Sequence, residues 1–197
     1  MRAKRASAIV VLSLLLIVSV WGMITFVLSA VNFKHNLSVW DDEIGIISNQ
    51  HSSNVKDLKY GFGTIGKNGC GAVAIYNILL LENKKTPLPN VIQAMDDGQY
   101  FFGLLGTKPT QMMKYLKSLG YSVSLHKDKS RFDEWAQKSD YSIYIYVGKN
   151  GGHYTLLVPN GDATFHSINL NKDRVTIPQL ISQHEDKFIN LLMTISK

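Results

Sequence analysis

The stretch GKNGCGAVAIYN, residues 66–77, decides how the rest of the chain is interpreted. Its Cys70 is the only cysteine in 197 residues, and it stands between Gly69 and Gly71. The run that follows, GAVAIYNILLLENKK, is apolar on nearly every side, which is typical of a helix buried all round. We therefore expect a central helix that begins at Cys70 and ends before the two prolines of NKKTPLP.

After this helix, helical patterns come first and strand patterns dominate later in the chain. Further helices are predicted in PNVIQAMDD, in TQMMKYLKSLG with a left-handed cap at Gly120, in SRFDEWAQKS from Ser130, and in IPQLISQHEDKF from Pro178. Strands are predicted in YSVSL, YSIYIYVG, HYTLLV, ATFHSINL and INLLMTIS, where β-branched and aromatic residues alternate with others. Helices followed by an antiparallel sheet indicate the α+β class.

The N-terminus is predicted to be a membrane anchor. Residues 6–33 carry no charge, and a helix needs about 20 apolar residues to cross the hydrocarbon of a bilayer. This is longer than the apolar core of a secretory signal, although Ala30 could end a cleaved one. Arg2, Lys4 and Arg5 precede the run, so the positive-inside rule places the N-terminus in the cytoplasm and the rest of the chain outside.

These features divide the chain into three parts. Residues 1–33 form the cytoplasmic tip and anchor, with membrane contact through residues 7–33. Residues 34–57 are polar and aperiodic, and we interpret them as a stalk. Residues 58–197 form one folded domain, with enough chain for a real core. The net charge of +6 includes three cations of the tip, which leaves no basic stripe of the kind that nucleic-acid binding requires.

Cys70 is a candidate nucleophile. The free N–H groups and the dipole of a helix N-terminus stabilise a thiolate and lower its pKa. Gly69 and Gly71 leave room for a substrate backbone, and Gly152 does the same further along the chain. The alternative is a buried small hydrophobe, because free cysteine is among the most buried residue types.

Among six histidines, His153 is best placed to act as the base. It follows two glycines and opens the apolar strand HYTLLV. A third group usually orients the imidazole of such a pair. Asn169, sixteen positions later, would return beside His153 in a hairpin, with Asn171 and Asp173 as alternatives in another register.

The sequence offers little for a metal or a cofactor, and we predict none. The histidines lack ligand spacing such as H-E-x-x-H, and one cysteine cannot make a thiolate zinc cluster. GFGTIG, residues 61–66, matches G-x-G-x-x-G superficially but lacks the strand–helix frame of a dinucleotide site.

With Cys70, His153 and Asn169 in this order, the chain resembles papain-like cysteine peptidases. More closely, NGCGAVAIYNILL, GTKPTQMMKYLKSLGYSVSL and GGHYTLLV resemble the bacteriocin-processing, or double-glycine, peptidases over about residues 58–170. The resemblance implies a helical half packed on an antiparallel sheet, with thiolate attack on an amide carbonyl. That family has a Gln six residues before the Cys as an oxyanion donor. Here the position holds Thr64, and Asn68 or Tyr60 are alternative donors.

Two principal functions follow. The first is a membrane-anchored, outward-facing cysteine peptidase that acts on a peptide or protein. In it Cys70 is the nucleophile, His153 the base and acid, and Asn169 the orienting residue. The second is a catalytically weak or inactive papain-like domain that binds a peptide or a cell-wall component in the same cleft. A partner subunit of a membrane complex is a third interpretation.

Overall fold

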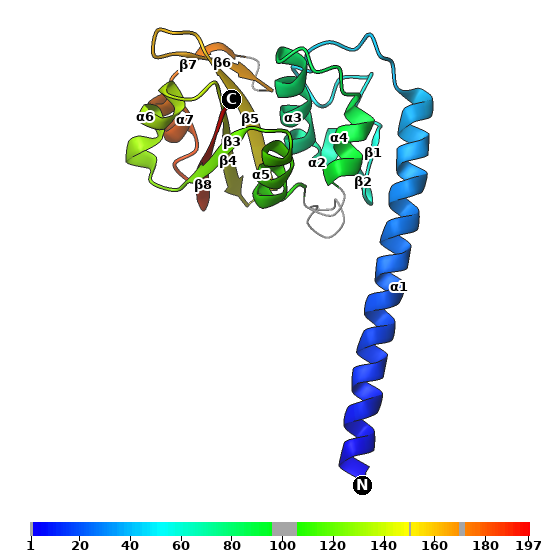
Figure 1. The fold of residues 1–197 in the computed structure, drawn as a ribbon. Helices are drawn as coiled ribbons and strands as arrows, with labels where there is room; N and C mark the ends of the chain where they lie inside the picture. The colour runs from blue at the N-terminus through cyan, green and yellow to red at the C-terminus, as the bar shows by residue number, and fades with distance from the viewer. Residues whose placement is uncertain (1, 96–105, 150, 170–171) are drawn as a thin grey trace.

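The computed structural model describes residues 2–95, 106–149, 151–169 and 172–197, without the side chains of residues 2–8 and 173. A long N-terminal helix runs along one side of a domain in which a helical half packs beside a sheet (Figure 1). This arrangement confirms the α+β class and the single long apolar helix at the N-terminus.

The helices lie mainly in the first two thirds of the chain. They are α1 Arg2–Val39, α2 Ile65–Asn68, α3 Cys70–Leu81, α4 Leu88–Met95, α5 Pro109–Ser118, the 3-10 turn η2 Lys129–Arg131, α6 Phe132–Gln137 and α7 Ile177–Gln183. The strands are β1 Lys59–Tyr60, β2 Gly63–Thr64, β3 Ser122–His126, β4 Tyr141–Gly148, β5 Gly151–Pro159, β6 Phe165–Ile168, β7 Lys172–Val175 and β8 Ile189–Ser196.

The predicted central helix is confirmed as α3. It is buried from Cys70 to Leu79 and packs against α4, α5 and β5. Because water is excluded from every side of it, an apolar residue is favoured at each position. The helix α3 thus lies between the other helices of the helical half and the sheet.

The second half is a six-stranded antiparallel sheet in the order β3-β8-β4-β5-β6-β7. Both faces are covered, so the alternating residues of β4 are buried on both sides. Ile143 and Ile145 join the core that contains α3, whereas Tyr144 joins a second core with Phe132 and Leu180 beneath α6 and α7. Strand β7 was not predicted, because its short, charged sequence KDRV carries no strand pattern.

The helix ends follow the predicted chemistry in part. Gly120 has φ +91° after α5, and the Tyr121 N–H donates to the Leu116 carbonyl, as expected of a left-handed cap. We predicted that the next helix begins at Ser130, but Ser130 does not cap it. The turn η2 precedes α6, and the Asp128 side chain accepts a hydrogen bond from the Ser130 N–H.

Residues 34–57, which the sequence suggests to be a stalk, pack on the domain instead. Residues 34–39 are the last turns of α1, and Ile47 and Val55 are buried in the α3 core. The Asn77 side chain accepts from the Ile47 N–H at 2.9 Å and donates to its carbonyl at 3.0 Å. The domain boundaries remain a prediction, and this packing favours a start near Ile44 over residue 58.

The helix α1 contains a run, Ile9–Val39, that is long and apolar enough to cross a membrane. Near its end, Asn32 donates to the Gly61 carbonyl at 2.8 Å, and Asn36 donates to the Lys59 carbonyl at 2.8 Å. Asn36 also accepts from the Lys59 N–H at 2.7 Å. Since Asn32 and Asn36 lie four residues apart, both face the β1–β2 hairpin.

Candidate active site

Cys70 is the first residue of α3, as predicted, but its thiol is not activated in the resting protein. The backbone N–H groups of Tyr154, Gly71 and Cys70 itself favour the thiolate. Burial outweighs them and raises the pKa of the thiol to about 11. The expectation of a lowered pKa is therefore wrong for this state, because residues from other segments remove water from the sulfur.

The predicted hairpin brings His153 and Asn169 together. Strands β5 and β6 pair antiparallel with Leu156 opposite Ile168, so the chain returns to His153 just after β6 ends. The His153 Nε2 atom lies 3.3 Å from the Asn169 carbonyl oxygen. Asn169 has φ +75°, a left-handed conformation that asparagine tolerates better than most residues.

Two groups of Asn169 lie near the Nε2 atom of His153. The backbone carbonyl, at 3.3 Å, can only accept a hydrogen bond, whereas the side-chain Nδ2, at 3.5 Å, can only donate one. The shorter contact favours the tautomer in which Nε2 carries the proton and donates it to the carbonyl. The other ring nitrogen, Nδ1, then holds a lone pair. A neutral imidazole with Nδ1 free is the form that can accept a proton from a thiol.

Gln50 orients the Asn169 side chain, and no pattern in the sequence predicts this role. Its backbone N–H donates to Asn169 Oδ1 at 3.3 Å, and its Oε1 accepts from Asn169 Nδ2 at 3.2 Å. Gln50 also donates from Nε2 to the Gly66 carbonyl at 3.0 Å. The Gln50 N–H can only donate, so Oδ1 must face it, and the ring is held by the Asn169 backbone carbonyl.

The Cys70 sulfur lies against the backbone of β5. The Tyr154 N–H forms a hydrogen bond with this sulfur. Tyr154 directly follows His153, and consecutive Cα atoms are about 3.8 Å apart. Among the described residues, no direct hydrogen bond joins Cys70 to His153. The raised pKa of Cys70 and the lowered pKa of His153 therefore favour a protonated thiol and a neutral imidazole at rest.

Other aromatic and imidazole rings surround His153. Tyr146 pairs with it across β4 and β5, with ring centroids 5.7 Å apart, and stacks on His184 at 3.8 Å. Burial lowers the pKa of His153, and the charges of His184 and His51 lower this pKa further, while its bond to Asn169 opposes the change. His184 is itself buried.

The predicted oxyanion donors lie just before Cys70. Thr64 ends β2 and precedes α2, where its side chain makes no capping hydrogen bond, and Asn68 is the last residue of α2. Both are half-buried. The Tyr60 hydroxyl is engaged with Thr107. The role of Thr64 or Asn68 as a donor stays a prediction.

The glycines around Cys70 have a packing role in this fold. A Cβ on Gly69 would lie 2.4 Å from Ile65 Cδ1, and one on Gly71 would lie 3.1 Å from Met112 Sδ. The contact at Gly69 leaves no space for a Cβ, whereas the contact at Gly71 is tight and would require its neighbour to shift slightly. Gly152 is exposed, with its missing Cβ 3.3 Å from Val147 Cγ2. Substrate contact by these three glycines stays a prediction.

The sequence offers Asn171 and Asp173 as alternatives to Asn169. Asn171 and the side chain of Asp173 lie outside the described residues. Asp162, in the turn between β5 and β6, forms an ion pair with Arg174 at the far end of the hairpin.

A cavity of about 520 Å³ opens beside the base. Its lining includes His153, Tyr146, Gly152, Asp186 and Lys187, whereas Cys70 does not line it. Among the described residues, no group of three or more His, Cys, Asp and Glu side chains gathers as metal ligands would.

Comparisons with known proteins find relatives by structure only. No protein-family model matches the chain, and no curated protein matches it. The structure is similar to the peptidase domain of ComA from Streptococcus, a bifunctional ABC transporter of a quorum-sensing pathway, at 12% identity and a TM-score of 0.47. That alignment covers 64% of this chain and 90% of the ComA chain.

It is also similar to a double-glycine motif protease from an AMS/PCAT transporter, solved in complex with the leader peptide. The identity is 16% and the TM-score 0.44, over 64% of this chain and 82% of that chain. Both are double-glycine peptidases, the family that the sequence motifs resemble. At these values the likeness describes the general arrangement of helices and sheet, and it says nothing about individual residues.

Proposed function

We propose that this protein is a cysteine peptidase in which Cys70 attacks a peptide carbonyl, His153 transfers protons and Asn169 orients His153. The observation that carries the proposal is the fixed imidazole. Its Nε2 atom lies 3.3 Å from the Asn169 carbonyl oxygen, and the Cys70 sulfur lies at the backbone N–H of Tyr154, the residue after His153. This arrangement supports a pair in which Nδ1 of His153 accepts the thiol proton.

The reaction follows from this resting state. As the Cys70 sulfur bonds to the carbonyl carbon, the thiol proton passes to His153 Nδ1. The imidazolium then protonates the leaving amine nitrogen and the C–N bond breaks, which leaves a thioester on Cys70. Water, deprotonated by His153, attacks the thioester and releases the acid and the free thiol. In this mechanism the N–H groups at the start of α3 donate hydrogen bonds to the developing oxyanion.

A concerted transfer of this kind suits the high pKa of Cys70. With a thiol pKa of about 11, only about one molecule in 10⁴ carries a thiolate at pH 7. Attack must therefore be coupled to proton removal by His153, whose pKa is lowered so that the neutral base prevails near pH 7.

The membrane anchor and the outward orientation belong to the same proposal. The apolar helix supports a single-pass anchor. Arg2, Lys4 and Arg5 support a cytoplasmic N-terminus, so the domain would face outside the cell.

The second candidate is a binding domain with weak or no turnover. Two observations favour it: Cys70 is only 5% exposed, and Thr64 stands where the related peptidases have a Gln. The loss of one oxyanion donor typically costs about 10²–10³ in turnover.

The two candidates are separated by a cleavage assay on the full chain in detergent. Purified protein is incubated with a diverse peptide library, and new termini are identified by mass spectrometry for the wild type, Cys70→Ala and His153→Ala. Cleavage by the wild type alone supports the peptidase. Peptide capture that is equal for the wild type and Cys70→Ala, with no new termini, refutes the peptidase and favours the binding domain.

A further inference from the structure

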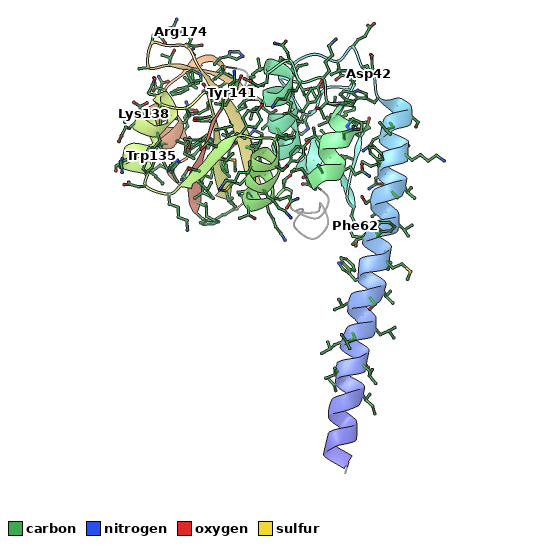
Figure 2. The ribbon with its side chains drawn as sticks, viewed as in Figure 1. Asp42, Phe62, Trp135, Lys138, Tyr141 and Arg174 are labelled. Carbon is green, nitrogen blue, oxygen red and sulfur yellow. The ribbon has the colours of Figure 1, made fainter. Side chains whose placement is uncertain are left out.

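The tip of the β1–β2 hairpin presents an aromatic side chain beside the apolar helix. Phe62 is 43% exposed, and its ring lies 5.9 Å from that of Trp21 in α1. Figure 2 shows Phe62 at the edge of the domain that faces α1. A single exposed phenylalanine is common on the surface of a soluble protein. The level of Phe62 relative to the apolar helix α1 is therefore the observation that matters.

The hairpin is fixed to α1 by buried polar contacts. Asn32 and Asn36 are 7% and 0% exposed, and they satisfy backbone groups of Gly61 and Lys59. Breaking these contacts would leave buried amides without partners, which is costly. The hairpin backbone therefore stays at the level of Asn32 and Asn36, and the Phe62 ring reaches down from it to the Trp21 ring.

The length of the helix sets where the bilayer ends. Ala6 to Trp21 is 16 residues, or about 24 Å at about 1.5 Å per residue. The hydrocarbon is about 30 Å thick and takes about 20 residues. With Arg5 held at the inner headgroups, the outer boundary therefore falls at or above Trp21.

The domain sets the upper limit. Asn32 lies 11 residues beyond Trp21, about 16 Å higher along the helix. At that level the polar hairpin backbone is docked, and Lys34 and Lys59 are exposed. Charged side chains at this height disfavour hydrocarbon around them. The boundary thus lies between Trp21 and Asn32, and Phe62, beside Trp21, lies at or below it.

We propose that Phe62 inserts into the outer leaflet, so that the β1–β2 hairpin forms a second membrane contact beside the anchor. Aromatic residues are favoured at the interface between headgroups and acyl chains, and an apolar side chain there reaches about 5–10 Å into the bilayer. The contact holds the domain in one orientation on the membrane. This inference rests on the proposed anchor and is independent of the peptidase chemistry.

The test measures lipid contact in the full chain. Single cysteines are placed by Phe62→Cys, Lys59→Cys and Lys138→Cys in a Cys70→Ala background, and each is labelled with bimane. Lys138 is the control, because it is exposed on α6 far from α1 (Figure 2). The proteins are reconstituted into phosphatidylcholine vesicles with or without bromine on the acyl chains, and flotation verifies insertion.

Brominated lipid should quench the label at position 62 by more than half, the label at 59 less, and the label at 138 not at all. Equal quenching at 62 and 138 overturns the proposal, as does no quenching at 62 in vesicles that carry the protein. A signal at 62 that changes with the protein-to-lipid ratio and not with bromine identifies a second copy of the chain as the contact, and also overturns it. Failure to float refutes the anchor and this contact together.

Discussion

Gln50 offers the sharpest test of the site, because its side chain links the loop before Cys70 to Asn169. Gln50→Ala removes the hydrogen bonds to the Gly66 carbonyl and from Asn169 Nδ2. Asn169 is half-exposed and can turn to water, whereas Gly66 is buried. A buried carbonyl left without a partner costs about 1–3 kcal/mol, so we expect a loss of about 2 kcal/mol in the free energy of unfolding.

For a domain of this size, about 1 kcal/mol corresponds to about 2–4 °C in Tm. Gln50→Ala should therefore lower Tm by about 4–8 °C, measured on the full chain in detergent by intrinsic fluorescence during heating and in urea. The catalytic rate should fall less than about tenfold, since the backbone contacts from Gln50 N–H to Asn169 and from Asn169 to His153 remain.

Two matched variants separate the causes. Gln50→Glu keeps the volume but points a carboxylate at the Gly66 carbonyl, so it should destabilise at least as much as Gln50→Ala. Ser53→Ala, at an exposed position of the same segment, should leave Tm unchanged. A Gln50→Glu variant as stable as the wild type would show that the site needs volume and not these hydrogen bonds, and would refute the reasoning.

The state of the thiol and the source of imidazole orientation give two further predictions. Because the pKa of Cys70 is raised from 9.0 to about 11, its thiolate fraction below pH 9 is about 100-fold lower than in the unfolded chain. Iodoacetamide should therefore alkylate Cys70 at least about 100-fold more slowly in the native protein than in urea at pH 8, with a rate that rises up to about pH 11; comparable rates would contradict a buried, neutral thiol. Asn169→Gly keeps the left-handed backbone and the carbonyl on His153, whereas Asn169→Ala adds about 1–2 kcal/mol of strain, so the Gly variant should cleave peptide faster. If the Ala variant is equally fast or faster in the same assay, the backbone carbonyl does not orient the ring.

Local patterns were enough to predict the elements that carry Cys70, His153 and Asn169. The apolar run after Cys70 has only one stable environment, a helix buried on all sides. The strand patterns of β5 and β6 and the sixteen-residue spacing from His153 to Asn169 predict a hairpin, because its two strands and turn leave little freedom in register. Each of these predictions concerns residues that are close in the sequence or that belong to one hairpin.

The features that the sequence did not reveal depend on distant segments. Gln50 lies in SNQHSS, which has no period, and its partner Asn169 is 119 residues away. His184 is exposed in a helical projection but buried because β4 places Tyr146 against it. The pKa of Cys70 follows the same logic: the local helix start lowers it, whereas burial by remote residues raises it more.

The pairing of Gln50 with Asn169 also explains why an amide suits position 169. The Asn169 side chain must accept from the Gln50 N–H and donate to Gln50 Oε1. A carboxylate could accept but not donate, and it would face the Oε1 oxygen. Gln50 could relieve this repulsion only by rotating its amide, which would turn Oε1 toward the Gly66 carbonyl and replace one repulsion by another. Asn169, Gln50 and Gly66 are thus mutually constrained, and the loop before Cys70 is tied to the group that orients His153.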